Sequence, residues 1–236
     1  MTDLYVVPQR SSRILANTLR IYFTHFGVIV PIFAVTLFPF WIIWDFVASS
    51  VASILVLQLV NFAIITVATG VLTAAIHDIC VGNRPTIAHS FSFANERFGN
   101  LLGVSLLETL IISLGLVLLI VPGIILWAFY LFSASVVIVD GCSPREALKE
   151  SRRLMSGNFW KCTAVYAPLW FLSGAVQIGS IFLIEAEEPT VVQSLLANFI
   201  AICFVPPPQI AAVLMYYDMK ACKDGRDIRP LFADLT

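Results

Sequence analysis

Charged residues are scarce in this chain. Asp, Glu, Lys and Arg make up 12% of its 236 residues, compared with about 25% in a typical soluble domain. Hydrophobic residues make up 59%, and the mean hydropathy is +0.90. Because so little polar material cannot cover a water-facing surface, the composition excludes a soluble globular domain and indicates a membrane protein.

The chain also lacks the short motifs of common catalytic and nucleotide-binding sites. It has no P-loop, no GxSxG elbow, no HExxH and no dinucleotide fingerprint. Its five cysteines show no CxxC spacing and its three histidines no ligand-like spacing, so we predict no metal site and no cofactor. No stripe of basic and aromatic residues indicates nucleic-acid binding. The loops are too short for a catalytic domain, and we expect a protein that is not an enzyme.

The apolar residues gather into long runs that can cross the ~30 Å bilayer core as helices. Pro122-Gly123 predicts a tight turn between the third and fourth runs, with a kinked continuous helix as the alternative. Pro206, Pro207 and Pro208 predict a break in the last run, because each proline removes a backbone donor. We expect half-helices there over about 191–205 and 208–219. The pattern predicts an all-α polytopic protein with six transmembrane helices, at about 22–44, 52–79, 101–121, 123–139, 160–184 and 190–217.

A polar stretch over residues 140–161 separates the fourth and fifth runs. Ser143 can cap a helix whose first turn holds Pro144, and Gly157 and Asn158 are expected to end it. The apolar side chains of this helix recur with helical spacing, which is typical of an amphipathic helix lying in the membrane interface. The residues of its apolar face are Ala147, Leu148, Ser151, Leu154 and Met155.

Two earlier stretches have the same layout. Gly82 to Pro85 precede a second short amphipathic segment, and residues 12–26 form a third. The predicted face of the second segment holds Ile87, Ala88, Phe91, Ser92, Ala94 and Phe98. Aligning Gly82 with Gly141 aligns Pro85 with Pro144. We predict a threefold internal repeat of one interfacial helix and two spans. The repeats cover about 1–80, 81–139 and 140–219, in a single membrane domain over 1–219 with a polar tail over 220–236.

The distribution of positive charge predicts the orientation. In the six-span arrangement all 14 Lys and Arg residues lie on one side, while the opposite loops hold Asp45, Glu185, Glu187 and Glu188. Cytoplasmic loops collect Lys and Arg, so we expect an inner-membrane protein with both termini in the cytoplasm. The cations of its most basic interfacial helix would contact anionic lipid or a protein partner, and that partner could be a second copy of the chain. The alternative is that these charges only set the topology. The cations of that helix are Arg145, Lys149, Arg152 and Arg153.

Glu108 lies inside the third apolar run, where a carboxylate is costly. Its candidate partners are polar residues of other runs, Asn61, Gln177 and Asn198. One interpretation is an ion, proton or head-group site. The other is a hydrogen-bonded packing residue, or a side chain that reaches the interface.

Several segments resemble a known family. They are Ile120–Leu126, Val136–Asp140, Ser143–Trp160 and Met215–Lys220 followed by Asp224–Asp227. Together they are similar to the six-span membrane domain fused to some bacterial glycerophosphoryl diester phosphodiesterases. The resemblance implies a fold and a membrane location. It does not imply the phosphodiesterase reaction, because the catalytic barrel of those fusions is missing, and it offers no ligand residues to carry over.

Two functions remain open from the sequence. The first is a non-enzymatic integral inner-membrane protein that organises or binds lipid, or a protein partner, through basic interfacial helices. The alternative is a small transporter or channel that uses Glu108 and the proline-broken sixth span.

Overall fold

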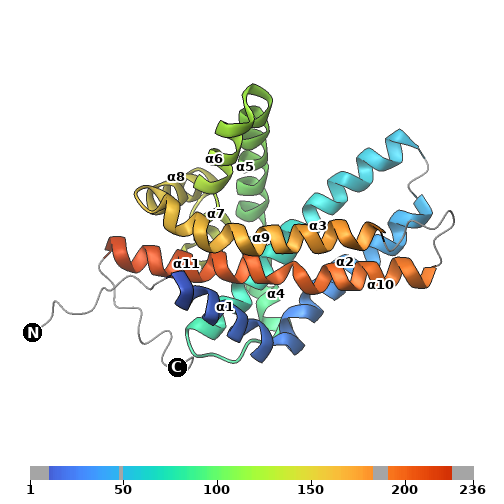
Figure 1. Cartoon of the computed structure of the whole chain (residues 1–236), viewed down its shortest axis with the longest axis horizontal. Helices are drawn as coiled ribbons and strands as arrows, with labels where there is room; N and C mark the ends of the chain where they lie inside the picture. The colour runs from blue at the N-terminus through green and yellow to red at the C-terminus, as the bar shows by residue number, and fades with distance from the viewer. Residues whose placement is uncertain (1–10, 48–49, 183–190, 225–236) are drawn as a thin grey trace, which may run out of the picture.

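The computed structural model describes residues 11–47, 50–182 and 191–224 (Figure 1). All regular structure within these ranges is helical, and it confirms the predicted all-α fold. The helices are α1 (Ser11–Thr24), α2 (Phe26–Val47), α3 (Val51–Cys80), α4 (Ile87–Glu96), α5 (Phe98–Leu118), α6 (Ile120–Phe129), α7 (Ser133–Asp140), α8 (Pro144–Met155), α9 (Phe159–Phe182), α10 (Val191–Phe204) and α11 (Pro206–Asp224).

The order of helices repeats three times. A short helix is followed by a hairpin: α1 precedes α2 and α3, α4 precedes α5 and the α6–α7 pair, and α8 precedes α9 and the α10–α11 pair. Five helices of the described chain are long and apolar enough to cross a membrane, when α6 with α7 and α10 with α11 are each counted as one. The number becomes six if α1 and the start of α2, bent by 77°, are taken together.

The first apolar run begins later than predicted. The sequence placed its start near residue 22, but α1 continues to Thr24 and α2 begins at Phe26. The reason is the buried stripe of α1, in which Ile14, Thr18 and Ile21 follow one another at helical spacing and pack against α11. Tyr22 therefore belongs to α1 and not to α2.

The predicted face of the second short helix is partly wrong. Ala88 and Ser92 are exposed. Ala94 is buried against α3 as predicted, and so is Ser90, which the sequence did not place on this face. The aligned prolines do not occupy equivalent positions, because Pro85 precedes the first residue of α4 while Pro144 is the first residue of α8. The shifted start turns a different face of α4 toward the protein.

The third and fourth runs form a tight hairpin, as predicted. The turn is Leu119, which has extended backbone angles (φ −161°, ψ 140°). Pro122 and Gly123, the predicted turn, instead lie in the first turn of α6, where the missing N–H of proline has no helical partner to lose. Gly123 brings the two helices close, because a Cβ there would lie 2.8 Å from the backbone nitrogen of Leu116. The fourth run is also interrupted after Phe129, which the sequence did not predict.

The triple proline breaks the last run, as predicted. α10 ends at Phe204 and α11 begins at Pro206 and continues to Asp224, beyond the predicted 219, with the two helices nearly in line (Figure 1). Pro207 and Pro208 cannot donate to the carbonyls of Cys203 and Phe204 one turn back. Other helices replace these donors. Tyr22 of α1 donates to the Cys203 carbonyl at 2.6 Å, and Ser173 of α9 donates to the Phe204 carbonyl at 2.6 Å.

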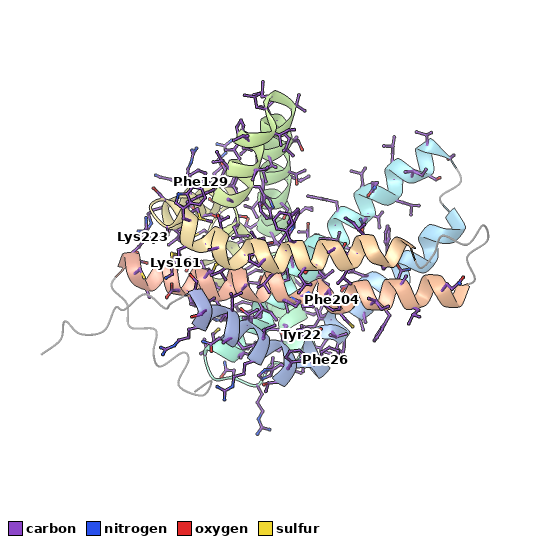
Figure 2. The ribbon with its side chains drawn as sticks, viewed as in Figure 1. Tyr22, Phe26, Phe129, Lys161, Phe204 and Lys223 are labelled. Atoms are coloured by element: carbon purple, nitrogen blue, oxygen red, sulfur yellow. The ribbon has the colours of Figure 1, made fainter. Side chains whose placement is uncertain are left out.

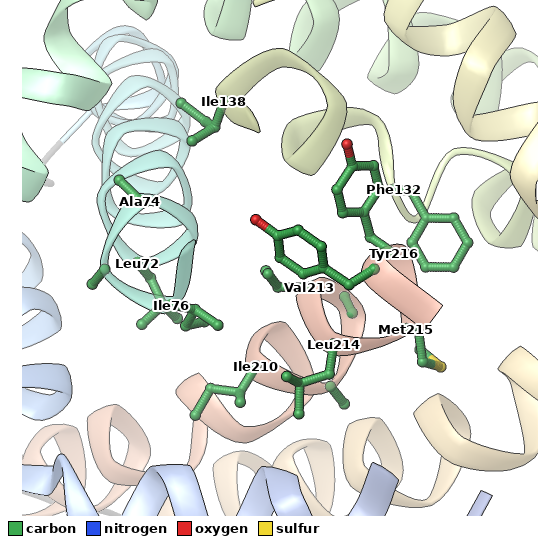
Figure 3. Packing of buried hydrophobic residues seen from close by; sticks show 14 of the residues in the cluster. Leu72, Ala74, Ile76, Phe132, Ile138, Ile210, Val213, Leu214, Met215 and Tyr216 are labelled. Carbon is green, nitrogen blue, oxygen red and sulfur yellow. The ribbon is translucent and has the colours of Figure 1, made fainter. Parts of the chain in front are cut away.

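Most of α11 is buried, and it contacts α1, α3, α8 and α9. We call the region around it the hub; it comprises α1, residues 66–80 of α3, α4, α7, α8 and α11. Figure 3 shows the core of the hub, where side chains of α3 and α7 surround those of α11. The hairpins extend outward from the hub with many exposed apolar side chains (Figures 1 and 2), as expected for surfaces that meet lipid.

Candidate functional site

The helix α8 begins as the sequence predicted. Ser143 is the N-cap and Pro144 the first residue. The carboxylate of Glu146 accepts hydrogen bonds from the Ser143 hydroxyl at 2.7 Å and from the Ser143 backbone N–H at 3.1 Å. The hydroxyl bond, followed by the backbone bond, lowers the pKa of Glu146. Its negative charge stays at the N-terminal end of α8, where the helix dipole favours it.

The predicted apolar face of α8 is also confirmed, but it packs against protein. Its five residues are all buried, and α8 contacts α5, α6, α7 and α11. The approach is close, because a Cβ added to Gly103 of α5 would lie 2.9 Å from Pro144. The rotation of α8 about its axis is therefore fixed by the protein itself.

This rotation exposes the four cations of α8. Arg153 is engaged, because its guanidinium contacts Glu150 at 2.6 Å and Asp224 of α11 at 2.8 Å. These bonds raise the pKa of Arg153 further above its usual value. In the described residues no carboxylate pairs with the other three cations. We call these three the basic face: Arg145, Lys149 and Arg152.

Aromatic residues flank the C-terminal end of the basic face. The guanidinium of Arg152 lies 5.6 Å from the centre of the Phe129 ring. Phe129 contacts Phe159, which in turn contacts Trp160 edge to face. Trp160 is 81% exposed. Trp160 is thus connected to Arg152 through two phenylalanine rings, and exposed tryptophans are typical of the membrane–water interface.

Ser151, on the apolar face of α8, lies at the break between α6 and α7. Its hydroxyl donates to the carbonyl of Phe129 at 2.8 Å and accepts from the N–H of Phe132 at 3.1 Å. It thus satisfies one backbone group on each side of the break. The sequence offered one signal for this role, a lone serine in the middle of an apolar face.

Glu108 is half-buried on α5. It accepts a hydrogen bond at 2.6 Å from the hydroxyl of Ser133, which is the first residue of α7. Asn61 lies on α3, Gln177 on α9 and Asn198 on α10, and within the described ranges none of these amides bonds to Glu108. The carboxylate lies instead at the N-terminal end of α7, where the helix dipole stabilises negative charge.

Sequence reasoning missed a polar cluster around α11. Tyr216 donates to Asp140 of α7 at 2.8 Å, and Lys220 pairs with the same carboxylate. Lys161, at the start of α9, pairs with Asp218 at 2.6 Å, and the Asp218 side chain is only 3% exposed. Figure 2 shows Lys161 at the same end of the molecule as Phe129 and Lys223.

The cluster continues to α3 and α4. Tyr217 bonds to the ring of His77, and the His77 ring stacks on Phe93 of α4. The adjacent Asp78 contacts His89 of α4 at 2.9 Å. Residues 216–220 of α11 thus connect α3, α7 and α9, one helix from each hairpin. In the sequence, residues 215–220 stand out only through the family resemblance.

The fold and these contacts define a multi-pass helical membrane protein that presents a basic helix. The chain is similar to a UPF0259 membrane protein of Pectobacterium carotovorum subsp. carotovorum (strain PC1), with 28% identity over 123 residues. These residues are 52% of this chain and 49% of the relative, so the similarity spans about half the length of that curated protein. No family model and no solved structure matches. The likeness to the phosphodiesterase membrane domain stays a prediction.

Proposed function

We propose that this chain is a non-enzymatic inner-membrane protein whose basic face binds anionic lipid head groups on the cytoplasmic side. One observation carries the proposal: Arg145, Lys149 and Arg152 are exposed on a helix whose other side is buried in its own protein. Trp160, which is exposed and is connected to Arg152 through the rings of Phe129 and Phe159, supports a position at the head-group level.

The packing of α8 bears on affinity. A flexible basic segment loses conformational entropy when it binds, whereas α8 is already held in place by its buried face. A cation near an anionic surface contributes about 1 kcal/mol. Three such cations correspond to about 3 kcal/mol, or a preference of roughly a hundredfold for anionic lipid over neutral lipid.

The orientation follows from the charges that the structure describes. Cations lie on α1, on the segments flanking α4, on α8, at the start of α9 and at the end of α11, and the α5–α6 turn has none. This distribution supports a cytoplasmic hub with cytoplasmic termini. Residues Arg10, Arg226 and Arg229 and the acidic loop at 185–188 lie outside the described residues, as does the side chain of Asp45.

The test compares two double variants in reconstituted full-length protein in which Trp160 is the only tryptophan. Brominated phosphatidylglycerol should quench Trp160 more than brominated phosphatidylcholine, because the anionic lipid gathers at the basic face. Lys149→Gln with Arg152→Gln should reduce this preference by roughly thirtyfold, from about 2 kcal/mol of lost attraction. Arg13→Gln with Arg84→Gln removes the same charge elsewhere and should leave the preference nearly unchanged.

Two results would contradict the proposal: equal quenching by both lipids in the parent protein, or equal losses in the two double variants. An acidic protein partner would be indicated instead by a complex that forms in neutral lipid and depends on the same α8 cations.

The contacts favour this function over a transporter or channel. The carbonyls freed at the triple proline already accept from Tyr22 and Ser173, and Glu108 already accepts from Ser133. Groups that an ion would need are thus engaged within the protein, which supports a structural role for both features.

A further inference from the structure

We infer that the α5–α6 hairpin ends inside the bilayer, with its tip among the acyl chains of the leaflet that α8 contacts. The inference rests on the proposed position of α8 at the head groups. By length and composition, both legs of the hairpin are candidate spans. However, the part of the hairpin that extends beyond the level of α8 is too short to cross the bilayer.

The tip of the hairpin has no polar residue. Leu118, Leu119, Ile120 and Val121 are each 66% to 71% exposed, and residues 109–128 contain no charged side chain. A turn that emerges into water is expected to carry polar residues. The α2–α3 hairpin does so, since Ser50 caps α3. The apolar tip therefore fits an acyl-chain environment.

Contacts with α8 set the level at which the hairpin leaves the head groups. Phe129, the last residue of α6, contacts Ser151 through its carbonyl and Arg152 through its ring. On the other leg, Glu108 bonds to Ser133, just past the α6–α7 break. Phe129 and Glu108 thus lie near the level of the exposed cations of α8.

The remaining length is short. α6 has 10 residues, and at 1.5 Å per residue it extends about 15 Å beyond that level. This is half of the ~30 Å hydrocarbon core. The rest of the second leg, α7, packs within the hub with five of its eight residues buried.

The direction of the hairpin adds to this limit. Figure 1 shows α5 and α6 leaving the hub in a direction different from that of α9 and α10. Hairpins that diverge cannot all lie along the bilayer normal, and a tilted hairpin reaches a smaller depth than its length. The same arrangement accounts for Glu108, because a carboxylate is costly at the bilayer centre but tolerated near the head groups.

The backbone of the tip suits a site without water. The N–H of Leu119 donates to the Gly115 carbonyl at 3.0 Å, and the N–H of Gly123 donates to the Leu119 carbonyl at 3.3 Å. Pro122 has no N–H to satisfy. Backbone groups in hydrocarbon must be satisfied internally, and these two bonds satisfy the N–H groups on either side of Pro122 and the carbonyl of Leu119.

The test measures the depth of single cysteines in full-length protein whose native cysteines are replaced by alanine. A spin label at Leu119→Cys should be accessible to oxygen and protected from a water-soluble nickel chelate, at a depth near the bilayer centre. Labels at Ser50→Cys and Asn83→Cys, in exposed turns before α3 and before α4, should be accessible to nickel. In intact cells an impermeant maleimide should modify Ser50→Cys and neither of the other two cysteines. Asn83→Cys should become reactive only after lysis.

Modification of Leu119→Cys from outside intact cells, or nickel access to its label, would overturn the inference. If the cysteine-free protein does not accumulate, a photo-crosslinking amino acid at position 119 should yield a phospholipid adduct, and an adduct-free protein would count against the inference. Lipid preference and tip depth are separate readouts. If the basic face shows no lipid preference but the tip lies deep in the bilayer, only the proposed function is contradicted. If the basic face prefers anionic lipid but the tip emerges into water, only this inference is contradicted.

Discussion

At the scale of single residues, Ser151 shows how a small polar side chain takes its role from its neighbours. Its spacing assigned it to an apolar face, and it is indeed fully buried. Its hydroxyl contacts the backbone on both sides of the α6–α7 break. Because apolar surroundings offer no replacement partner, each of these backbone groups depends on the serine.

Replacing Ser151 with alanine should therefore destabilise the protein by about 1–3 kcal/mol, the cost of leaving buried polar groups unsatisfied. The free energy of unfolding, measured by denaturant titration in detergent, checks this. Ser156→Ala, an exposed position after the same helix, is the matched control and should change stability by less than about 0.5 kcal/mol. Equal effects of the two substitutions would show that the bridge is unimportant.

At the scale of elements, the α5–α6 hairpin is held together by close approach. A Cβ on Gly115 would lie 3.1 Å from the Cα of Gly123, and one on Gly123 would lie 2.4 Å from the Leu116 side chain. The apolar runs and the turn signal predicted a hairpin, but propensity alone placed the turn at Pro122-Gly123. The turn moved to Leu119 because proline fits the first turn of a helix and glycine fits the contact between the two legs.

Gly123→Ala should separate the legs and cost about 1–3 kcal/mol from overpacking. Gly99→Ala is the control in the same hairpin. A Cβ there meets nothing within 4 Å, so it should be neutral or stabilise α5 by up to about 1 kcal/mol through helix propensity. Thermal unfolding of both variants in the same detergent decides the point, and a Gly123→Ala protein as stable as Gly99→Ala would refute the close-contact account.

At the scale of the whole molecule, α11 connects the three hairpins through side chains that leave it in different directions. Tyr217 contacts α3, Tyr216 and Lys220 contact α7, and Asp218 contacts α9. Apolar packing alone is weakly directional, whereas these pairs fix which face of α11 meets each hairpin. The hub thus depends on a few buried polar contacts as well as on its apolar core.

Lys161→Met should destabilise the protein by about 3–5 kcal/mol, because it removes the cation that lies 2.6 Å from the buried Asp218 carboxylate. Arg13→Met, at an exposed position of α1, is the control and should have an effect below about 0.5 kcal/mol. The exchanged pair, Lys161→Asp with Asp218→Lys, should recover part of the loss in a double-mutant cycle. A mild effect of Lys161→Met, comparable to the control, would mean that Asp218 does not need this partner.

Reasoning from the residues alone predicts the membrane class, the repeated order of short helix and hairpin, and the buried face of α8. These features depend on composition, periodicity and local capping, which act over one or two helical turns. Helix packing sets the partners of Glu108, the break between α6 and α7, the direction in which α4 faces, and the polar contacts of α11. Those depend on which helices meet, and residues far apart in the chain, such as Asp140 and Lys220, reveal their pairing only when packing brings them together.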